Sequence, residues 1–319
     1  MAAMSDLTLT TVLIVVTSLL PQSSCRYNGK YRVLGSSPIE YITTANFSLA
    51  NLPNDPHLEF RRCHFTSFGP DMFEALSPST KRVTFRKGTV REVLIGPTTR
   101  LERLQVIDTG LIALEAASDE PNYYLKQLTV RSRKFSEWSP SLASLRMLEE
   151  IDVAYCNLSY LNVQWFERYN HLKMLDVSKN RLMVFDVGMS GVPTLERLHL
   201  WGNHLEVLQR FPEAFPKLKK VTLAQNRWLC RWVANVRGAI FSQDVELMDM
   251  DGVCRAGWQI NGGLCCRSGE DKKTATSQRK TNDKSSIHVG HDFIGINGSV
   301  FGMKWRNTIV YVGEPLPIL

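Results

Sequence analysis

Four cysteines in the last third of the chain form the densest group of reactive side chains: Cys230, Cys254, Cys265 and Cys266. Thiols at such spacing either bind a metal ion or form disulfides. Adjacent cysteines rarely bond each other, so we expect Cys230 and Cys254 to bond separately to the Cys265–Cys266 pair, in either combination. The even number of cysteines and the export signal described next favour disulfides over a metal.

The amino-terminal segment is typical of a secreted protein. Residues Leu7 to Leu20 are uncharged and largely apolar, Pro21 closes them, and small polar residues lead to Cys25. This pattern predicts a signal peptide over residues 1–25, since the run is shorter than the roughly 20 apolar residues of a membrane-spanning helix. The alternative interpretation is a membrane-anchored amino terminus.

The chain has three Asn-x-Ser sequons, at Asn46, Asn157 and Asn297, which are glycosylation sites only in a secreted protein. We expect glycosylation at Asn46 and Asn157. Removal of the signal peptide with Cys25 leaves six of the seven cysteines. The two outside the C-terminal group, Cys63 and Cys156, are predicted to be buried free thiols.

Composition and motifs argue against an enzyme. The chain of 319 residues is 44% apolar and 22% charged, with 38 Lys and Arg against 31 Asp and Glu, which is globular and mildly basic. The sequence has no nucleophile elbow, zinc helix, phosphate-binding loop or dinucleotide fingerprint. The pair His288 and His291 has no cysteine or carboxylate neighbour, so we predict no metal site and no cofactor.

A repeat of about 23 residues organises the middle of the chain. The pattern LxxLxLxxNxL is complete in LKMLDVSKNRL from Leu172 and in LERLHLWGNHL from Leu195, and looser copies precede and follow them. The second apolar residue of each copy recurs at spacings of 25, 21, 24, 23, 24, 23 and 23 residues. These marker residues are Leu58, Val83, Leu104, Leu128, Ile151, Leu175, Leu198 and Val221.

This spacing predicts an α/β leucine-rich-repeat solenoid with about eight units. Strand side chains alternate between two faces, so the two aliphatic residues of LxL fill the coil and the residue between them faces outward. Stacked coils then share one core, which no single unit could bury alone. We expect a parallel β-sheet on the concave face, loops and short helices on the convex face, and a disulfide-closed C-terminal cap.

The Asn position of the motif has a structural role. We expect Asn180, Asn203 and Asn226 to turn the chain and to satisfy backbone groups from inside the solenoid. The same position holds Cys63, Gly88, Thr109, Arg133 and Cys156 in the other copies. Arg133 is a misfit there, and we expect locally distorted turns in the third to fifth repeats.

The predicted domains follow from these patterns. They are a signal peptide at 1–25, repeats with an N-terminal cap at 26–228, a cysteine-rich cap at 229–266, and a linker with a poorly ordered tail at 267–319. A helix over Trp232–Phe241 is expected to cover the open core of the last coil.

The chain resembles the leucine-rich-repeat immune (LRIM) family of mosquitoes over residues 26–266. The signal peptide and repeats contribute, and Asn226-x-x-x-Cys230 followed by Cys254 and Cys265–Cys266 is the most specific part. The resemblance implies a secreted haemolymph protein of innate immunity. The implied partner is a complement-like thioester-containing protein or another LRIM chain.

The sequence departs from that family after Cys266. Residues Ser268–Ser286 have almost no large apolar groups, which predicts a solvated linker. No heptad pattern follows in residues 287–319. The chain is therefore similar to the coil-less or short members of the family, and dimerisation through a coiled coil is not expected.

The outward positions of the strands predict a partner-binding concave face. We expect it to be basic in the N-terminal half, acidic in the middle and to carry an interface anchor at Trp201. The candidate residues are Arg61, Arg86, Arg103, Arg131, Asp152, Asp176, His199 and Trp201. The alternatives are a merely solvated charged face and a Trp201 that packs on an aliphatic neighbour.

Two further functions remain open from the sequence. The basic end could recognise an anionic microbial surface directly, or the chain could be an extracellular interaction module outside immunity. Nucleic acid is not an expected partner, because the protein is predicted to be exported, and no stable membrane insertion is expected.

Overall fold

The computed structural model describes most of the repeat region and cap, and the chain forms two compact units, Met1–Glu270 and Asp271–Leu319. The predicted signal peptide, the sequons at Asn46 and Asn297, and the pair His288 and His291 lie outside the described residues. The described residues are 26–27, 32–35, 41–42, 52, 54–166, 168–187, 191–269, 304–305 and 308–309.

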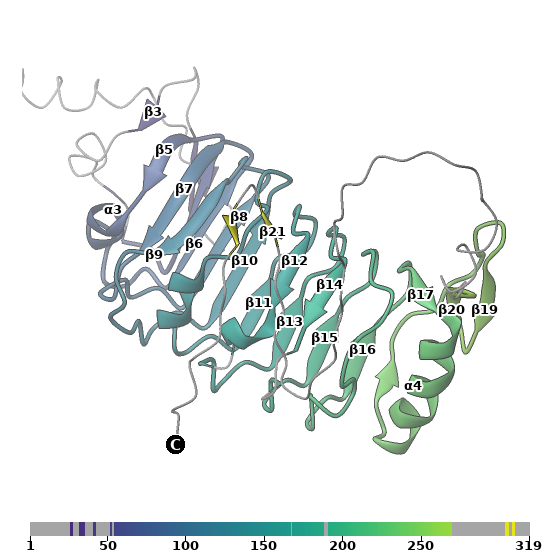
Figure 1. Cartoon of the computed structure of the whole chain (residues 1–319). Helices are drawn as coiled ribbons and strands as arrows, with labels where there is room; N and C mark the ends of the chain where they lie inside the picture. Colours follow the sequence, from purple (N-terminus) through teal and green to yellow (C-terminus); the bar gives the residue numbers. More distant parts are fainter. Residues whose placement is uncertain are drawn as a thin grey trace, which may run out of the picture. The chain divides into compact units, whose positions relative to one another are not determined.

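In the first unit, an 11-stranded sheet carries the repeats (Figure 1). Neighbouring strands are parallel except for the antiparallel pair β1–β2. In sheet order the strands are β1 (Arg26–Tyr27), β2 (Arg32–Gly35), β4 (His57–Arg61), β6 (Arg82–Arg86), β8 (Arg103–Ile107), β10 (Gln127–Arg131), β11 (Glu150–Asp152), β13 (Met174–Asp176), β15 (Arg197–His199), β16 (Lys220–Thr222) and β18 (Glu246–Leu247).

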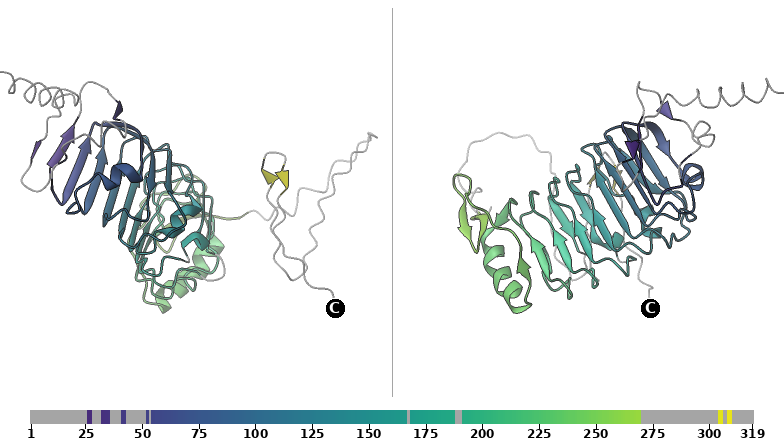
Figure 2. Two further views of the ribbon diagram at one scale, coloured as in Figure 1. Left: turned by 90° about the vertical axis from the view of Figure 1, so that its left-hand side faces the viewer. Right: turned by 180° about the vertical axis from the view of Figure 1, so that it is seen from behind.

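The register confirms the predicted solenoid. From Leu58 to Val221, each marker residue pairs directly with the marker of the next coil. All eight marker side chains are at most 1% exposed. The strands lie side by side in sequence order when the unit is seen from the front and from behind (Figures 1 and 2). The coils therefore share one continuous apolar core.

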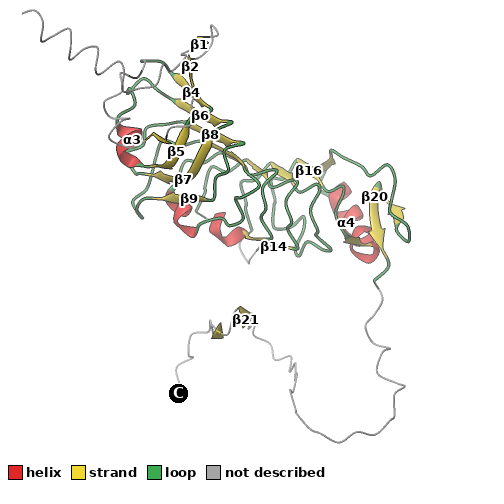
Figure 3. Ribbon diagram, turned by 90° about the horizontal axis from the view of Figure 1, so that it is seen from above, coloured by secondary structure: helices red, strands yellow, loops and turns green. Residues whose placement is uncertain are grey.

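The layer opposite this sheet contains more strands than expected. In the N-terminal coils it is a second parallel sheet of β3 (Tyr41–Ile42), β5 (His64–Phe68), β7 (Thr89–Ile95) and β9 (Ala113–Ala116). Short helices occupy the same side of the coil (Figure 3), namely α3 (Pro70–Glu74), η1 (Pro140–Ser144) and η2 (Val163–Phe166). Farther along, β12 (Tyr160–Asn162) pairs with β14 (Val184–Asp186). The segments of β5 and β7 combine buried apolar residues with exposed polar ones, which suits a half-buried strand.

The turn after each strand follows one rule. The residue before the Asn position is left-handed in seven of the eight coils, with φ between 53° and 71°. Its backbone N–H donates to the next coil, for example Tyr155 N to Ser178 O at 3.0 Å and Lys179 N to Trp201 O at 2.8 Å. These left-handed residues are Arg62, Lys87, Asp108, Tyr155, Lys179, Gly202 and Gln225.

The fourth coil is the exception and holds the predicted misfit. A buried guanidinium would be costly at the Asn position, and Arg133 is instead exposed. Ser132 takes the inward role, since its Oγ donates to Leu111 O at 2.8 Å. The chain then makes a turn closed by Phe135 N to Ser132 O at 3.1 Å, with Arg133 and Lys134 at its tip.

Asparagines bridge the C-terminal coils as expected. Asn203 Nδ2 donates to Val177 O at 3.0 Å and to Leu200 O at 2.9 Å, while its Oδ1 accepts from Leu182 N at 3.0 Å. Asn180 makes the equivalent contacts one coil earlier. Each buried amide thus satisfies backbone groups of two coils at once.

A helix and two disulfides close the last coil, which confirms the predicted cap. Helix α4 (Cys230–Ser242) follows β17 (Trp228–Leu229), and β19 (Gln259–Asn261) pairs with β20 (Leu264–Arg267). The Trp228 and Trp232 rings stack at 4.3 Å between centroids. The disulfides join Cys230 to Cys266 and Cys254 to Cys265.

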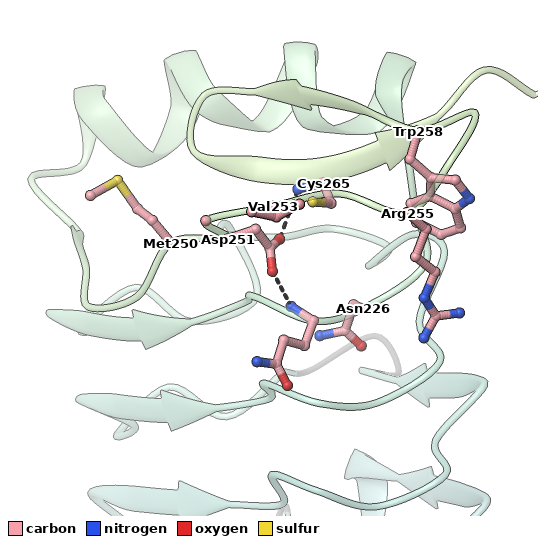
Figure 4. A pocket seen from close by; sticks show the side chains of 9 residues that line it. Asn226, Met250, Asp251, Val253, Arg255, Trp258 and Cys265 are labelled. Atoms are coloured by element: carbon pink, nitrogen blue, oxygen red, sulfur yellow. Dashed lines mark hydrogen bonds between the residues drawn. The ribbon is translucent and has the colours of Figure 1, made fainter.

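Two carboxylates of the cap accept hydrogen bonds from backbone N–H groups of the last coil, which has no further coil to pair with. Asp249 accepts hydrogen bonds from Leu223 N at 2.8 Å and Ala224 N at 3.0 Å. Asp251 accepts from Gln225 N at 2.9 Å and Cys265 N at 2.7 Å (Figure 4). The terminal backbone N–H groups are therefore satisfied by side chains of the cap.

The second unit is described only at β21 (Lys304–Trp305) and β22 (Thr308–Ile309), which pair antiparallel. Within the described parts of both units, no helix is long and apolar enough to cross a membrane.

Candidate partner-binding surface

The strands place the predicted residues in three rows along the sheet. Arg61, Arg86 and Arg131 stand in one register at the carboxyl ends of their strands, and Trp201 follows β15 at the same end. Arg103 lies at the amino ends of the strands beside Arg82. The row between them holds Asp152, Asp176 and His199. We call the row at the carboxyl ends, together with the turns that follow it, the C-edge.

Aromatic and cationic side chains interlock along the C-edge. Tyr155 and Trp201 meet edge to face with centroids 6.4 Å apart, and Lys179 Nζ lies 4.1 Å from the Trp201 centroid. Lys179 Nζ also donates to Gln225 Oε1 at 2.7 Å, and Arg131 Cζ lies 6.0 Å from the Tyr155 ring centre. We call these five residues the aromatic ladder.

Gly202 makes room for this arrangement. Its φ is +71°, and a Cβ at this position would lie 2.7 Å from Lys179 Cδ. The Lys179 side chain therefore passes directly over the glycine to reach the face of Trp201. Trp201 is half-buried and Tyr155 is 49% exposed, so the ladder presents an aromatic surface already held in place.

Most acidic residues in the middle of the face form salt bridges or hydrogen bonds within the protein. Arg131 and Asp152 form a salt bridge at 2.8 Å, and Arg197 and Glu150 form one at 2.9 Å. The hydrogen bond from Arg131 to Asp152 raises the pKa of Arg131. The free oxygen of Asp152 accepts from Ala154 N at 3.0 Å, so this carboxylate also fixes the local backbone.

Asp176 has the same local role. Its Oδ1 accepts from Ser178 N at 2.9 Å, just before the turn of that coil. In the C-terminal part of the row, His199 Nδ1 lies 3.4 Å from Thr222 Oγ1. Asp152, Asp176 and His199 therefore already have hydrogen-bond partners within the protein. Fewer of their polar atoms are available to a binding partner than the sequence predicts.

The N-terminal end of the face is basic, and the acid Glu59 is covered there. Glu59 is 2% exposed beneath Arg61 and Arg86, with Arg61 Nε at 2.8 Å and Arg86 Nε at 3.6 Å from its Oε1. Burial, with help from the charge of Arg82, lowers the pKa of His57 to about 4. Burial and the neighbouring charge of Arg103 lower the pKa of Arg82 as well.

Two hollows lie at either end of the aromatic ladder. One, of about 610 Å³, adjoins Arg131 and Tyr155 and includes Arg133. The other, of about 370 Å³, begins at Gln225 and continues into the cap, where Figure 4 shows Asp251 between the last coil and the Cys265 strand. Two apolar residues of its lining are well exposed, since Met250 is 75% and Val253 is 92% exposed.

The sequence interpretation missed a charged column beside the amino ends of the strands. Lys and Glu alternate strictly from coil to coil at the second motif position, and Lys173–Glu149 and Lys219–Glu196 form salt bridges at 2.9 and 2.8 Å. The signal was present as a charge alternation with the period of the repeat. The column comprises Lys81, Glu102, Lys126, Glu149, Lys173, Glu196 and Lys219.

The remaining predicted sites take no part in the aromatic ladder. Cys63 and Cys156 are both buried, and burial raises the pKa of Cys156 to about 11. Cys156 is therefore protonated at neutral pH and unsuited to forming an intermolecular disulfide. Asn157 is half-buried, and its glycosylation stays a prediction. Among the described residues, no group of three or more His, Cys, Asp or Glu could hold a metal ion.

Comparisons with known proteins agree on the fold. A family model described as "Leucine rich repeat" matches residues 146–205. The Drosophila melanogaster "Protein singed wings 2" is 30% identical over 87 residues, which cover 27% of this chain and 17% of that protein.

Two solved structures are similar at low identity. The mosquito LRIM1/APL1C complex aligns with a TM-score of 0.54 and 20% identity, over 75% of this chain and 50% of that chain. Human 5T4 (Wnt-activated inhibitory factor 1, trophoblast glycoprotein) aligns with a TM-score of 0.55 and 20% identity, over 71% and 89%. At these identities the likeness shows the fold alone.

Proposed function

We propose that this leucine-rich-repeat protein is a secreted binding protein that captures a protein partner along its C-edge. The observation that carries the proposal is the continuity of that edge. The ladder from Arg131 to Gln225 links a hollow at the fourth coil to a hollow in the cap, and both hollows share a residue with it.

The composition of the C-edge suits a protein interface. Tyr, Trp and Arg are enriched at interface cores, and the exposed Met250 and Val253 extend apolar surface beyond the ladder. Trp201 is preorganised by Lys179 and Gly202, so binding would immobilise few additional side chains. Trp201 is therefore the proposed anchor, with Tyr155 as its neighbour.

For the setting, we propose insect innate immunity, with a complement-like protein or another LRIM chain as partner. The support is the resemblance of the cap sequence, in which Cys230, Cys254 and Cys265–Cys266 follow Asn226 at the family's positions. The two disulfides fit an extracellular location. An interaction module outside immunity is the second candidate, because the repeats themselves occur in many families.

The proposed activity is binding without catalysis. The fold is typically a scaffold for protein interactions, and the described residues of the C-edge serve to hold one another in place. We propose no cofactor and no nucleic-acid partner.

The test is to recover the tagged full-length chain from haemolymph under non-reducing conditions and to identify what stays bound. We expect a specific protein with the wild-type chain, and its loss by at least about tenfold with Trp201→Ala, as for a hot-spot residue. Phe241→Ala is the matched control, since this ring is 88% exposed on α4, outside the ladder. Retention of the partner by a stably folded Trp201→Ala/Tyr155→Ala chain would overturn the proposed site.

A further inference from the structure

The hollow at the fourth coil contains cations, Arg86, Arg133 and Lys134, that the proposed function does not use. Its volume is about 610 Å³, and its lining includes the cations Arg86, Arg131, Arg133 and Lys134 with a single acid, Asp108, and the ring of Tyr155. Two of these cations come from the strands and two from the distorted turn that follows β10.

The fourth coil, which contributes Arg131, Ser132, Arg133 and Lys134 to the lining, breaks the turn rule. In the other coils, a left-handed residue leads into the Asn position, whereas here Ser132 faces inward. Arg133 and Lys134 consequently stand at the tip of a turn and are both exposed. The residue that fits the repeat least thus contributes to the hollow's positive charge.

The positive charge of the lining is incompletely neutralised. Arg86 shares the carboxylate of Glu59 with Arg61, and Arg86 Nε is buried without a hydrogen-bond partner among the described residues. Arg131 is paired with Asp152. Neither Arg133 nor Lys134 forms an ion pair within the described part of the chain.

We infer that this hollow binds a sulfate-bearing segment of an anionic polysaccharide. Guanidinium and ammonium groups bind sulfate oxygens by charge-assisted hydrogen bonds. The exposed Tyr155 ring offers an apolar face for a sugar ring, and the Asp108 carboxylate accepts hydrogen bonds from sugar hydroxyls. An acidic peptide is the poorer fit, because it offers fewer hydroxyl donors to Asp108 than a sugar does and has no sugar ring to lie on Tyr155.

The inference goes beyond protein capture, since it uses the basic end of the C-edge and not Trp201. The probe is a heparin oligosaccharide, compared with the same oligosaccharide after chemical desulfation and with a poly-glutamate peptide. Binding to the full chain is measured by calorimetry at several salt concentrations. We expect the sulfated sugar to bind most tightly and to weaken as salt screens the charges.

The decisive variant is Arg133→Ser/Lys134→Ser, because both side chains are exposed and contribute little to folding. We expect it to weaken heparin binding by about tenfold or more, because it removes one or two charge-assisted hydrogen bonds. Lys217→Ser/Arg231→Ser is the matched control, since it removes the same charge from exposed positions in the last coil and cap. Its binding should stay within about twofold of wild type, as expected when no direct contact is removed.

Three results would overturn the inference: equal weakening in the control, no weakening in Arg133→Ser/Lys134→Ser, or poly-glutamate bound as tightly as the sulfated sugar. The last result would point to an acidic protein segment instead. Trp201 does not line this hollow, so Trp201→Ala should weaken protein capture far more than heparin binding, and the two proposals can be told apart.

Discussion

The N-terminal and C-terminal coils satisfy equivalent backbone N–H groups with different acceptors. In the C-terminal coils, the N–H of Leu182 reaches the next coil through the amide oxygen of Asn203 at 3.0 Å. In the N-terminal coils, the equivalent N–H of Val90 bonds directly to the backbone oxygen of Thr109 at 3.1 Å. A small residue at the turn lets the two backbones meet, whereas an asparagine spans the gap with its side chain.

The packing beneath these turns differs in the same way. The N-terminal coils add a second sheet and a cluster of rings in which Phe60 and Phe85 stack at 5.3 Å and Phe68 and Phe85 meet at 4.8 Å. At the position of Phe60 and Phe85, the C-terminal coils have a buried aliphatic residue such as Leu200. One solenoid therefore contains two kinds of coil. The C-terminal coils follow the leucine-rich motif, and the N-terminal coils use aromatic residues and a second sheet instead.

The largest expected effect comes from the aromatic cluster. Phe85 is 1% exposed and contacts three other rings, so Phe85→Ala should destabilise the protein by about 4 kcal/mol. Hydrogen exchange should rise in the coils around β4–β8 well before the last coils, because each coil contacts only its neighbours. Uniform exchange throughout the first unit would show that the two regions are not separable.

The asparagine bridge should be the next most sensitive feature. Asn203→Ala leaves Val177 O, Leu200 O and Leu182 N without this partner, which should cost about 3 kcal/mol in urea unfolding. The matched change is Thr109→Ala at the same motif position, where Oγ1 is buried with no hydrogen-bond partner among the described residues. We expect it to cost about 1 kcal/mol or less. Equal losses would mean that the two turns do not differ as the contacts indicate.

Close backbone approach should make glycine essential in the N-terminal turns. A Cβ at Gly88 would lie 2.0 Å from the backbone oxygen of Cys63, so Gly88→Ala should cost about 2 kcal/mol or more. Gly238 in helix α4 is the control, because nothing lies within 4 Å of its Cβ position. Gly238→Ala should stabilise by about 0.5–1 kcal/mol. A neutral Gly88→Ala would contradict the direct backbone contact.

The sequence alone predicted the features that depend on periodicity. The eight markers, the buried asparagines and the cap helix all follow from apolar spacing or from a residue type with one favoured role. Burial of Glu59 could not be foreseen, because it depends on arginines from its own strand and the next coil. Nor could the capping by Asp249 and Asp251, since these residues replace a missing coil and belong to no repeat.

The smallest expected effect is a difference in how acidification changes the stability of the N-terminal coils and of the cap. The pKa of His57 is lowered from 6.5 to about 4, chiefly by burial, so its unfolded form takes up a proton more readily than its folded form. The stability that neutral His57 contributes is therefore present above pH 6.5 and is lost as the pH falls toward 4. We expect a loss of about 1 kcal/mol, after discounting for the partial exposure of the ring.

Asp249 should respond in the opposite sense, because burial raises its pKa, and its protonation on acidification favours the folded cap. Urea unfolding of His57→Gln should therefore vary less between pH 6.5 and 4 than that of the wild type. In hydrogen exchange over the same range, the coils around β4 should loosen while the turn at Leu223 and Ala224 does not. Loosening at both ends alike would show that acidification acts through net charge, and the contrast between the two ends would then rest on their packing and backbone contacts alone.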